Sequence, residues 1–341
     1  MKIRSKAPLR LGLAGGGTDV SPYSDTYGGC VLNATINMYA NSFIESREGS
    51  GLVNFHAKDL GITESIELDK DLPLEGSLPL HRAVYKTVME RYNRGNYLPL
   101  NVVTFCDAPP GSGLGSSSSM VVSMLEGYRQ LLNIPLGEYD LAKLAFHIER
   151  VVCQLSGGKQ DQYAATFGGF NFMEFSADDH VIVNPLRIRN HIINELEASL
   201  VLVYLGASRD SAKIIDDQIS SIGNAGRSLN AMHRVKASAL VIKARLLQGN
   251  IMDVAKEFKL SWEAKKATSS SIANEAIIKL ESRIISGPAI SMKVSGAGGG
   301  GFVMIFVDPE FKIELIRQIE RIGLAVQPFN FVSDGVISWT I

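Results

Sequence analysis

The chain has little cysteine and no imbalance of charge. Its 341 residues include three cysteines, and no two of them form a Cys-x-x-Cys pair. We therefore expect neither a disulfide framework nor a zinc site, and a reducing cytoplasm is the expected compartment. Lysine and arginine number 34 against 35 aspartates and glutamates. This balance offers no basic surplus that would favour nucleic acid as a partner.

Long apolar runs are also missing. The apolar stretch at residues 200–205 is far too short to span a bilayer, so no membrane partner is predicted. No apolar stretch follows the basic residues near Met1, and we therefore expect no signal peptide. The six histidines form neither a His-x-x-x-His nor a His-Glu-x-x-His pair, so the sequence predicts no histidine metal site.

The most informative segment is rich in glycine and serine. Residues 109–119 read PPGSGLGSSSS, after a β-prone run at 100–105 and before a helical pattern. A glycine-rich turn at a helix start binds anions, because unpaired N–H groups and the positive end of the helix dipole point to one place. Glycine also lets a phosphate approach the backbone closely. The predicted phosphate loop consists of Pro110, Gly111, Ser112, Gly113, Leu114, Gly115, Ser116 and Ser117.

Two common nucleotide motifs do not fit this loop. No lysine follows the glycines as a Walker A sequence requires, and the glycines are spaced G-x-G-x-G rather than G-x-G-x-x-G. The simplest alternative is a flexible surface loop. The strand before the loop and the amphipathic helix after it favour the phosphate site instead.

Periodicity divides the chain into two α/β halves. In the first half, strand patterns such as residues 30–36 and 40–46 are followed by a helical pattern at 80–94. In the second half, helical patterns fill residues 210–286 between strand patterns. Without the extra helices, the order is β-α-β-β-α-β, which is typical of a ferredoxin-like unit. We place the boundary near residue 190.

Three motifs resemble those of the GHMP kinases, the family of galactokinase, homoserine kinase, mevalonate kinase and phosphomevalonate kinase. Pro-x-x-x-Gly-Leu-x-Ser-Ser at residues 109–117 is similar to their ATP-binding motif. Residues 7–10 (Ala-Pro-Leu-Arg), running into 16–19 (Gly-Gly-Thr-Asp), resemble the N-terminal motif. Residues 293–301 (KVSGAGGGG) resemble the C-terminal glycine-rich motif. Together they extend over nearly the whole chain, which is identified as a member of this family.

The resemblance implies an α+β, two-domain GHMP kinase fold. Residues 1–190 would form the ATP-binding domain, an α/β domain similar to ribosomal protein S5 with a left-handed βαβ unit. Residues 191–341 would form the ferredoxin-like C-terminal domain. The implied activity is phosphoryl transfer from ATP, with Mg²⁺, to an alcohol group of a small molecule.

The resemblance also suggests which residues carry the chemistry. Ser117 and Glu149 would bind Mg²⁺, although Glu149 alone reads as a solvated helix glutamate. Asp161 would act as the general base or as an orienting group for the acceptor hydroxyl, and its alternative is a carboxylate that stabilises a helix N-terminus. Arg10 stands where several members have lysine. It would pair with Asp161 or contact the γ-phosphate, and a solvent-facing strand arginine is the alternative.

The acceptor is indicated by a narrower resemblance. Residues 14–19 (Ala-Gly-Gly-Gly-Thr-Asp), 157–163 and 208–212 are similar to the bacterial heptose 7-phosphate kinases of this family. Those enzymes phosphorylate the C1 hydroxyl of D-glycero-α-D-manno-heptose 7-phosphate, and the 1,7-bisphosphate leads to GDP-heptose for surface polysaccharide. The Gly-Glu-His of galactokinases is absent, which argues against galactose. The implied substrate contacts are Thr18, Asp19, Gly298 and the cations Lys159 and Arg209.

Two other functions stay open at this stage. L-fucose kinase domains have similar glycine-rich openings, so another anomeric sugar kinase is one alternative. A GHMP-fold sugar sensor without turnover is the second, although Ser117, Glu149 and Asp161 are all present. The sequence also leaves a homodimer open.

Overall fold

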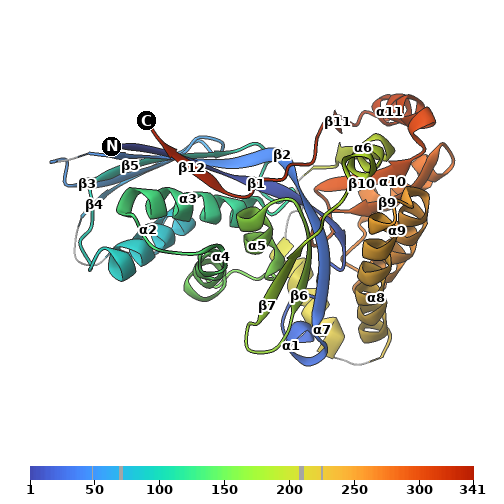
Figure 1. Ribbon diagram of the computed structural model, residues 1–341, viewed down its shortest axis with the longest axis horizontal. Helices are drawn as coiled ribbons and strands as arrows, with labels where there is room; N and C mark the ends of the chain where they lie inside the picture. Colours follow the sequence, from blue (N-terminus) through green and yellow to red (C-terminus); the bar gives the residue numbers. More distant parts are fainter. Residues whose placement is uncertain (48, 69–71, 207–210, 224–225) are drawn as a thin grey trace.

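Two β-sheets organise the molecule (Figure 1). The computed structural model describes residues 1–341 except 48, 69–71, 207–210 and 224–225. The larger sheet has eight strands and the smaller one has four. Within the described part of the chain, no helix has both the length and the apolar character needed to cross a bilayer.

The larger sheet is built around two long strands. β1 (Lys2–Ala14) and β2 (Gly29–Ser46) pair antiparallel, with register shifts at Pro8/Leu9 and Gly12/Ala14. The sheet order is β12-β1-β2-β5-β3-β4, and β6 and β7 extend it from the first part of β2. The remaining strands are β3 (Leu52–Ala57), β4 (Ile62–Glu67), β5 (Leu100–Cys106), β6 (Phe170–Phe175), β7 (Val181–Pro185) and β12 (Ile337–Thr340).

Helices cover one face of this sheet. Figure 1 shows α2 (Pro79–Tyr92), α3 (Ser116–Leu132), α4 (Glu138–His147) and α5 (Gln160–Phe167) on the same side of it. The predicted apolar stripe of α3 is buried, with Val121, Met124 and Tyr128 fully covered. α3 therefore fixes the end of the glycine-rich loop to the core, because the loop leads directly into the helix.

The spacing of apolar residues from 141 to 155 predicts one helix, but the observed helix ends earlier. α4 stops at His147, and a π-helical turn, Ile148–Val152, replaces its last part. In this turn the N–H of Cys153 donates to the carbonyl of Ile148, five residues before it, at 2.9 Å. Such π-turns insert one residue into a helix and are frequent at functional sites. Glu149 lies in this turn.

The smaller sheet has the predicted ferredoxin-like topology. β8 (Leu200–Tyr204), β9 (Ala289–Val294), β10 (Phe302–Val307) and β11 (Val326–Gln327) pair antiparallel in the order β11-β8-β10-β9. Both faces are covered, since Leu200 and Leu202 belong to the large core while Val201 and Val203 belong to a second core. The remaining helices are α1 (Tyr23–Tyr27), α6 (Asn190–Ser199), α7 (Ser211–Gly223), α8 (Arg227–Leu247), α9 (Ile251–Lys266), α10 (Glu275–Ile285) and α11 (Lys312–Arg321).

The end of the chain departs from the predicted division at residue 190. β12 pairs with β1 at the edge of the larger sheet, with Lys6 opposite Ile337 and Ile3 opposite Thr340. The last strand thus lies in the first sheet, and both termini lie at the same end of the molecule (Figure 1). The large core is also continuous between the halves, because it contains residues of β1, α3, α9 and β10.

Candidate active site

A cavity of about 280 Å³ opens where the two halves meet. Its walls come from the turn after β1, the glycine-rich loop, the π-turn, the start of α5, and helices α7 and α9. The charged residues that line it are Arg10, Asp19, Glu149, Arg150, Asp161 and Lys265. Four of these six were predicted as site residues.

The predicted phosphate loop forms one wall of the cavity. Gly111, Gly113, Gly115, Ser116 and Ser117 line it, whereas Ser112 and Leu114 are fully buried behind them. Gly115 caps α3 in the left-handed conformation, with φ 76°. The first N–H groups of α3 have no acceptors within the helix, so the wall presents donors to a phosphate.

The C-terminal glycine-rich motif packs on the phosphate loop. A Cβ on Gly113 would lie 2.4 Å from the Ser295 carbonyl oxygen, and one on Gly296 would lie 2.7 Å from the Gly113 oxygen. The two backbones are therefore in contact. Gly298, expected to bind substrate, packs against Ile272 and is not among the residues that line the cavity.

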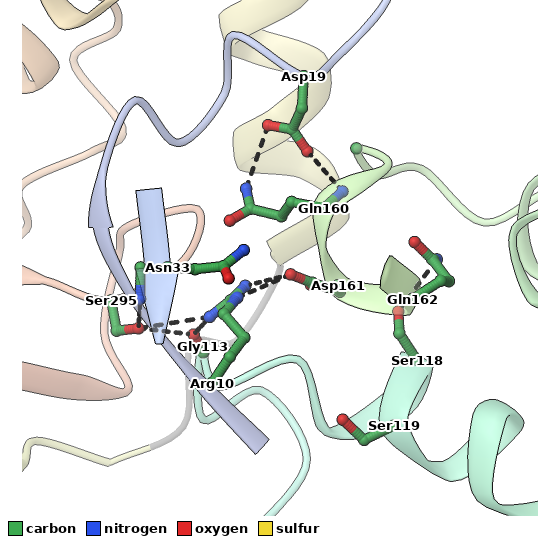
Figure 2. Close-up of polar contacts among 12 residues, drawn as sticks. Arg10, Asp19, Asn33, Gly113, Ser118, Ser119, Gln160, Asp161, Gln162 and Ser295 are labelled. Atoms are coloured by element: carbon green, nitrogen blue, oxygen red, sulfur yellow. Dashed lines mark hydrogen bonds and ion pairs between the residues drawn. The ribbon is translucent and has the colours of Figure 1, made fainter. Parts of the chain in front are cut away.

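The first turn of α5 directs three successive side chains to three parts of the site. Gln160 contacts Asp19, Asp161 contacts Arg10, and Gln162 contacts Ser118 (Figure 2). Successive side chains leave a helix about 100° apart, so three neighbouring residues of one turn can reach three different partners. The sequence analysis singled out only Asp161 of this turn.

Arg10 pairs with Asp161, which is one of the two roles expected for it. Its Nε donates to Asp161 Oδ1 at 2.8 Å, and a second guanidinium nitrogen lies 2.6 Å from the same oxygen. The third nitrogen donates to the Gly113 carbonyl at 2.6 Å and to Ser295 Oγ at 3.4 Å. Arg10 therefore joins Asp161, the phosphate loop and the C-terminal motif at one point (Figure 2).

Ser117 and Glu149 also meet. Ser117 Oγ donates to Glu149 Oε1 at 2.8 Å, and Gln162 donates to Glu149 Oε2. Glu149 is 1% exposed, and among the described residues its carboxylate has neutral donors and no ion pair. A buried carboxylate and a hydroxyl that line a phosphate-sized cavity are hard oxygen donors of the kind Mg²⁺ prefers. These residues fit the expected metal.

Asp19 lies in the cavity wall, but Thr18 does not. Gly17 donates to Asp19 Oδ1 at 3.0 Å, and Gln160 donates to both carboxylate oxygens at 3.1 Å. The hydroxyl of Thr18 is enclosed by backbone groups of Gly15 and Cys30. Thr18 therefore holds the turn that presents Asp19.

Lys265 of α9 is a cavity residue that the sequence analysis missed. Its Nζ donates to the Gly16 carbonyl at 2.9 Å and to Gln218 Oε1 at 3.2 Å. Burial lowers the pKa of Lys265 to about 8, although the nearby Asp19 carboxylate opposes this shift. No motif marks this lysine, and its contacts connect residues far apart in the chain.

A second buried lysine lies behind the cavity. Lys293, the first residue of the C-terminal motif, donates to the carbonyls of Gly12 and Leu13 at 3.1 and 3.0 Å. Burial, together with the nearby charges of Lys265 and Arg10, lowers the pKa of Lys293 to about 7. Lys293 thus ties β9 to the end of β1.

Of the two cations expected to bind an acceptor phosphate, Lys159 lies away from this cavity. Lys159 Nζ lies 2.8 Å from Asp179 and 3.7 Å from Asp25, in a separate cavity of about 80 Å³. Arg209 lies outside the residues that the structure describes.

A largely apolar cavity of about 240 Å³ adjoins the first one. Gly111, Ser116 and Ser117 line both. Its other walls include His81, which is bonded to Thr104 at 2.8 Å and whose pKa burial lowers to about 4. His81 is therefore uncharged at neutral pH, and Asp59 also lines this cavity. The other lining residues include Pro110, Leu60, Leu78, Leu80, Cys106 and Met120.

Comparisons with known proteins agree with this geometry. The sequence model described as "GHMP kinases N terminal domain" matches residues 79–169. The D-glycero-alpha-D-manno-heptose 7-phosphate kinase of Campylobacter jejuni is 42% identical over 99% of both chains. The L-fucokinase/L-fucose-1-P guanylyltransferase of Bacteroides fragilis is 25% identical and matches 93% of this chain but 36% of its own length.

Among solved structures, a D-glycero-D-manno-heptose 1-phosphate kinase from Bacteroides thetaiotaomicron superimposes with a TM-score of 0.85. It is 42% identical, with 99% of each chain covered. The fold, the ordered motifs and the full-length similarity lead to one assignment. The chain is a phosphotransferase with an alcohol group as acceptor, and it belongs to the GHMP kinase family.

Proposed function

We propose that this enzyme transfers the γ-phosphoryl group of ATP, with Mg²⁺, to the C1 hydroxyl of D-glycero-α-D-manno-heptose 7-phosphate in the cytoplasm. The observation that supports it best is the placement of two pairs in one cavity. Arg10–Asp161 and Ser117–Glu149 both lie beside the phosphate loop. The similarity to the Campylobacter heptose 7-phosphate kinase supports the choice of acceptor.

ATP would occupy both adjoining cavities. The apolar one suits a nucleobase, because most of its lining is apolar and its histidine is neutral, with Asp59 as its one carboxylate among the described residues. The shared residues Gly111, Ser116 and Ser117 would then lie along the phosphates. This arrangement directs the γ-phosphate toward Arg10 and Asp161.

Ser117 and Glu149 would hold Mg²⁺. When bound, the ion neutralises charge on the phosphate oxygens and orients them for transfer. Gln162 would fix the carboxylate of Glu149 in position, because it donates to the second oxygen. A positioned ligand reduces the reorganisation that binding would otherwise require.

Asp161 would receive the acceptor hydroxyl. Arg10 occupies its Oδ1, while Oδ2 lies on the side of the phosphate loop, 3.3 Å from the position of a Cβ on Gly115. Oδ2 would accept the hydrogen bond of the C1 hydroxyl and take its proton as the new O–P bond forms. Arg10 would hold the carboxylate in place and add positive charge near the transferring group.

Asp19 would bind another hydroxyl of the sugar. Its carboxylate is oriented by three neutral N–H donors, so one acceptor position can serve a ligand. We retain the preference for a phosphorylated sugar and propose Arg209, ahead of α7, as a phosphate contact. Ala212 and Ile215 of α7 line the same cavity. Lys159 is not proposed for that role, because its ammonium group pairs with Asp25 and Asp179.

The test must separate two heptose phosphates. Phosphorylation of heptose 7-phosphate at C1 and of heptose 1-phosphate at C7 give the same 1,7-bisphosphate, so the product does not distinguish them. The Bacteroides thetaiotaomicron structure carries the name of a heptose 1-phosphate kinase, which makes this the second candidate. A coupled ADP-release assay should therefore offer both heptose phosphates, free heptose, mannose and L-fucose.

Highest kcat/KM on heptose 7-phosphate is the expected result. Preference for heptose 1-phosphate would shift the transfer to C7, and preference for L-fucose would favour the fucokinase alternative. Tight sugar binding without ADP release on any acceptor would indicate a sensor instead.

A further inference from the structure

Lys265 and Asp19 face the same part of the cavity. Both line it, and Gly17 touches both: its N–H donates to Asp19 Oδ1 at 3.0 Å, and a Cβ on it would lie 2.8 Å from Lys265 Nζ. Gly17 also has φ +100°, which other residues rarely adopt. The glycine thus allows a lysine from α9 to approach a carboxylate from the turn after β1.

Lys265 has more N–H donors than it has acceptors among the described residues. An ammonium group carries three N–H donors, and among the described residues Gly16 and Gln218 accept two of them. Lys265 is only 4% exposed, so bulk water has little access to the third. Buried polar groups rarely stay unpaired. A ligand in the cavity would therefore supply the missing acceptor.

The neighbouring carboxylate determines which ligand group fits. A phosphate at Lys265 would also lie close to Asp19, and the two negative charges would repel each other. A neutral hydroxyl has no such conflict, because it can accept from the ammonium group and donate to another acceptor. A donor beside an acceptor matches two hydroxyls on adjacent carbons of a sugar.

We propose that Lys265 and Asp19 bind two neighbouring hydroxyl groups of the acceptor, Lys265 as donor and Asp19 as acceptor, with the acceptor's phosphate held elsewhere. This inference rests on the proposed sugar kinase function. It makes Lys265 a residue that selects the configuration of the sugar. Gln218 is a positioning residue, since its side chain accepts from Lys265 and donates to Thr268 at 3.1 Å.

The test compares Lys265→Met with Lys259→Met, a matched lysine that is exposed on the same helix. Acceptor binding is measured by calorimetry with a non-hydrolysable ATP analogue, and turnover by ADP release. Lys265→Met should weaken binding of heptose 7-phosphate and of free heptose by the same factor, roughly tenfold or more for a lost charge-assisted hydrogen bond. ATP affinity should stay within about threefold, and Lys259→Met should match the wild type on both acceptors.

Two results would overturn the proposal. One is a loss confined to heptose 7-phosphate, which would assign the phosphate to Lys265. The other is unchanged binding of both sugars. Lys265→Gln replaces the methionine variant if circular dichroism shows that the latter does not fold.

A second arm needs no stable variant. Wild-type enzyme is offered three analogues of heptose 7-phosphate, each lacking one hydroxyl, at C2, C3 or C4. For two hydroxyls on neighbouring carbons, the analogue that lacks either one should bind about tenfold or more weakly than the intact sugar. Equal binding of all three analogues would refute the paired contact. Failure of the kinase proposal would look different, because the unaltered enzyme would then release no ADP with the intact sugar phosphate.

Discussion

Asp161→Asn tests the centre of the proposed mechanism. The asparagine keeps the shape of the side chain and one oxygen for Arg10, but it has no negative charge and takes up no proton. If Asp161 accepts the proton of the acceptor hydroxyl, kcat should fall by about 10²–10⁴-fold, the usual cost of losing a general base. ATP affinity should change little, because Arg10 keeps its bond to Gly113 of the phosphate loop.

The structure also sets the expected loss of stability. The side chain of Arg10 is 4% exposed and that of Asp161 is 21% exposed, so the pair is mostly shielded from water. Breaking a buried pair costs about 3–5 kcal/mol. In the asparagine variant the amide oxygen still accepts from Arg10, which also keeps its 2.6 Å bond to Gly113. We therefore expect the free energy of unfolding to fall by about 1–3 kcal/mol. At about 2.1 cal/mol/K per residue, the 341 residues convert this to a Tm decrease of about 1.5–4 °C.

The assay combines ADP release, ATP calorimetry and thermal unfolding on the same preparations. Asp140→Asn is the control, because this exposed aspartate also lies in the first turn of a helix. It should leave kcat and Tm near the wild-type values. A kcat for Asp161→Asn within about threefold of wild type would refute the role in proton transfer, whereas a Tm decrease alone would leave Asp161 as a structural partner of Arg10.

The proposed metal ligands and the glycine that packs on Asp19 give three further predictions. Ser117→Ala should lower kcat about 10²-fold and raise the Mg²⁺ concentration needed for half-maximal rate; an unchanged Mg²⁺ dependence would remove Ser117 from the site. Glu149→Gln should do the same more strongly, and full activity of the wild type in EDTA would contradict both. Gly158→Ala places a Cβ 1.9 Å from Asp19 Oδ2 and should lower kcat/KM for the acceptor about 10²-fold while KM for ATP holds. Gly137→Ala is its control, since the nearest atom to that Cβ is 3.9 Å away, and equal kinetics of the two variants would argue against Asp19 as a substrate contact.

The phosphate loop could be predicted from the sequence because it is local in the chain. The phosphate loop is a strand, a glycine turn and a helix in succession, so composition and periodicity alone predict where its N–H groups point. The pairing of Arg10 with Asp161 was one of two expectations for Arg10, and the structure shows that contact. The ferredoxin-like strand order of the second sheet was likewise visible from the order of elements.

The missed residues depend on contacts between distant segments. Gln160 meets Asp19 across 141 positions, and Lys265 meets Gly16 across 249. Glutamine and lysine are also common on helix surfaces, so nothing in their type distinguishes a buried one. Glu149 was hard to place for a related reason. The π-turn that carries it changes the helical period by one residue, and a 3.6-residue pattern does not detect that change.

The contrast between Lys159 and Lys265 has a simple geometric origin. Lys159 directly precedes α5 and stands two residues before Asp161. Residues two apart on a helix point to opposite sides, so Lys159 and Asp161 cannot point in the same direction. Asp161 faces the cavity, and Lys159 accordingly extends toward Asp25 and Asp179. In the proposed site, the cation that contacts the sugar hydroxyls is instead Lys265 of α9, from the opposite half of the molecule. If both halves bind the acceptor as proposed, the site depends on how they are joined, and the contacts from Lys293 to Gly12 and Leu13 contribute to that junction beside the shared core.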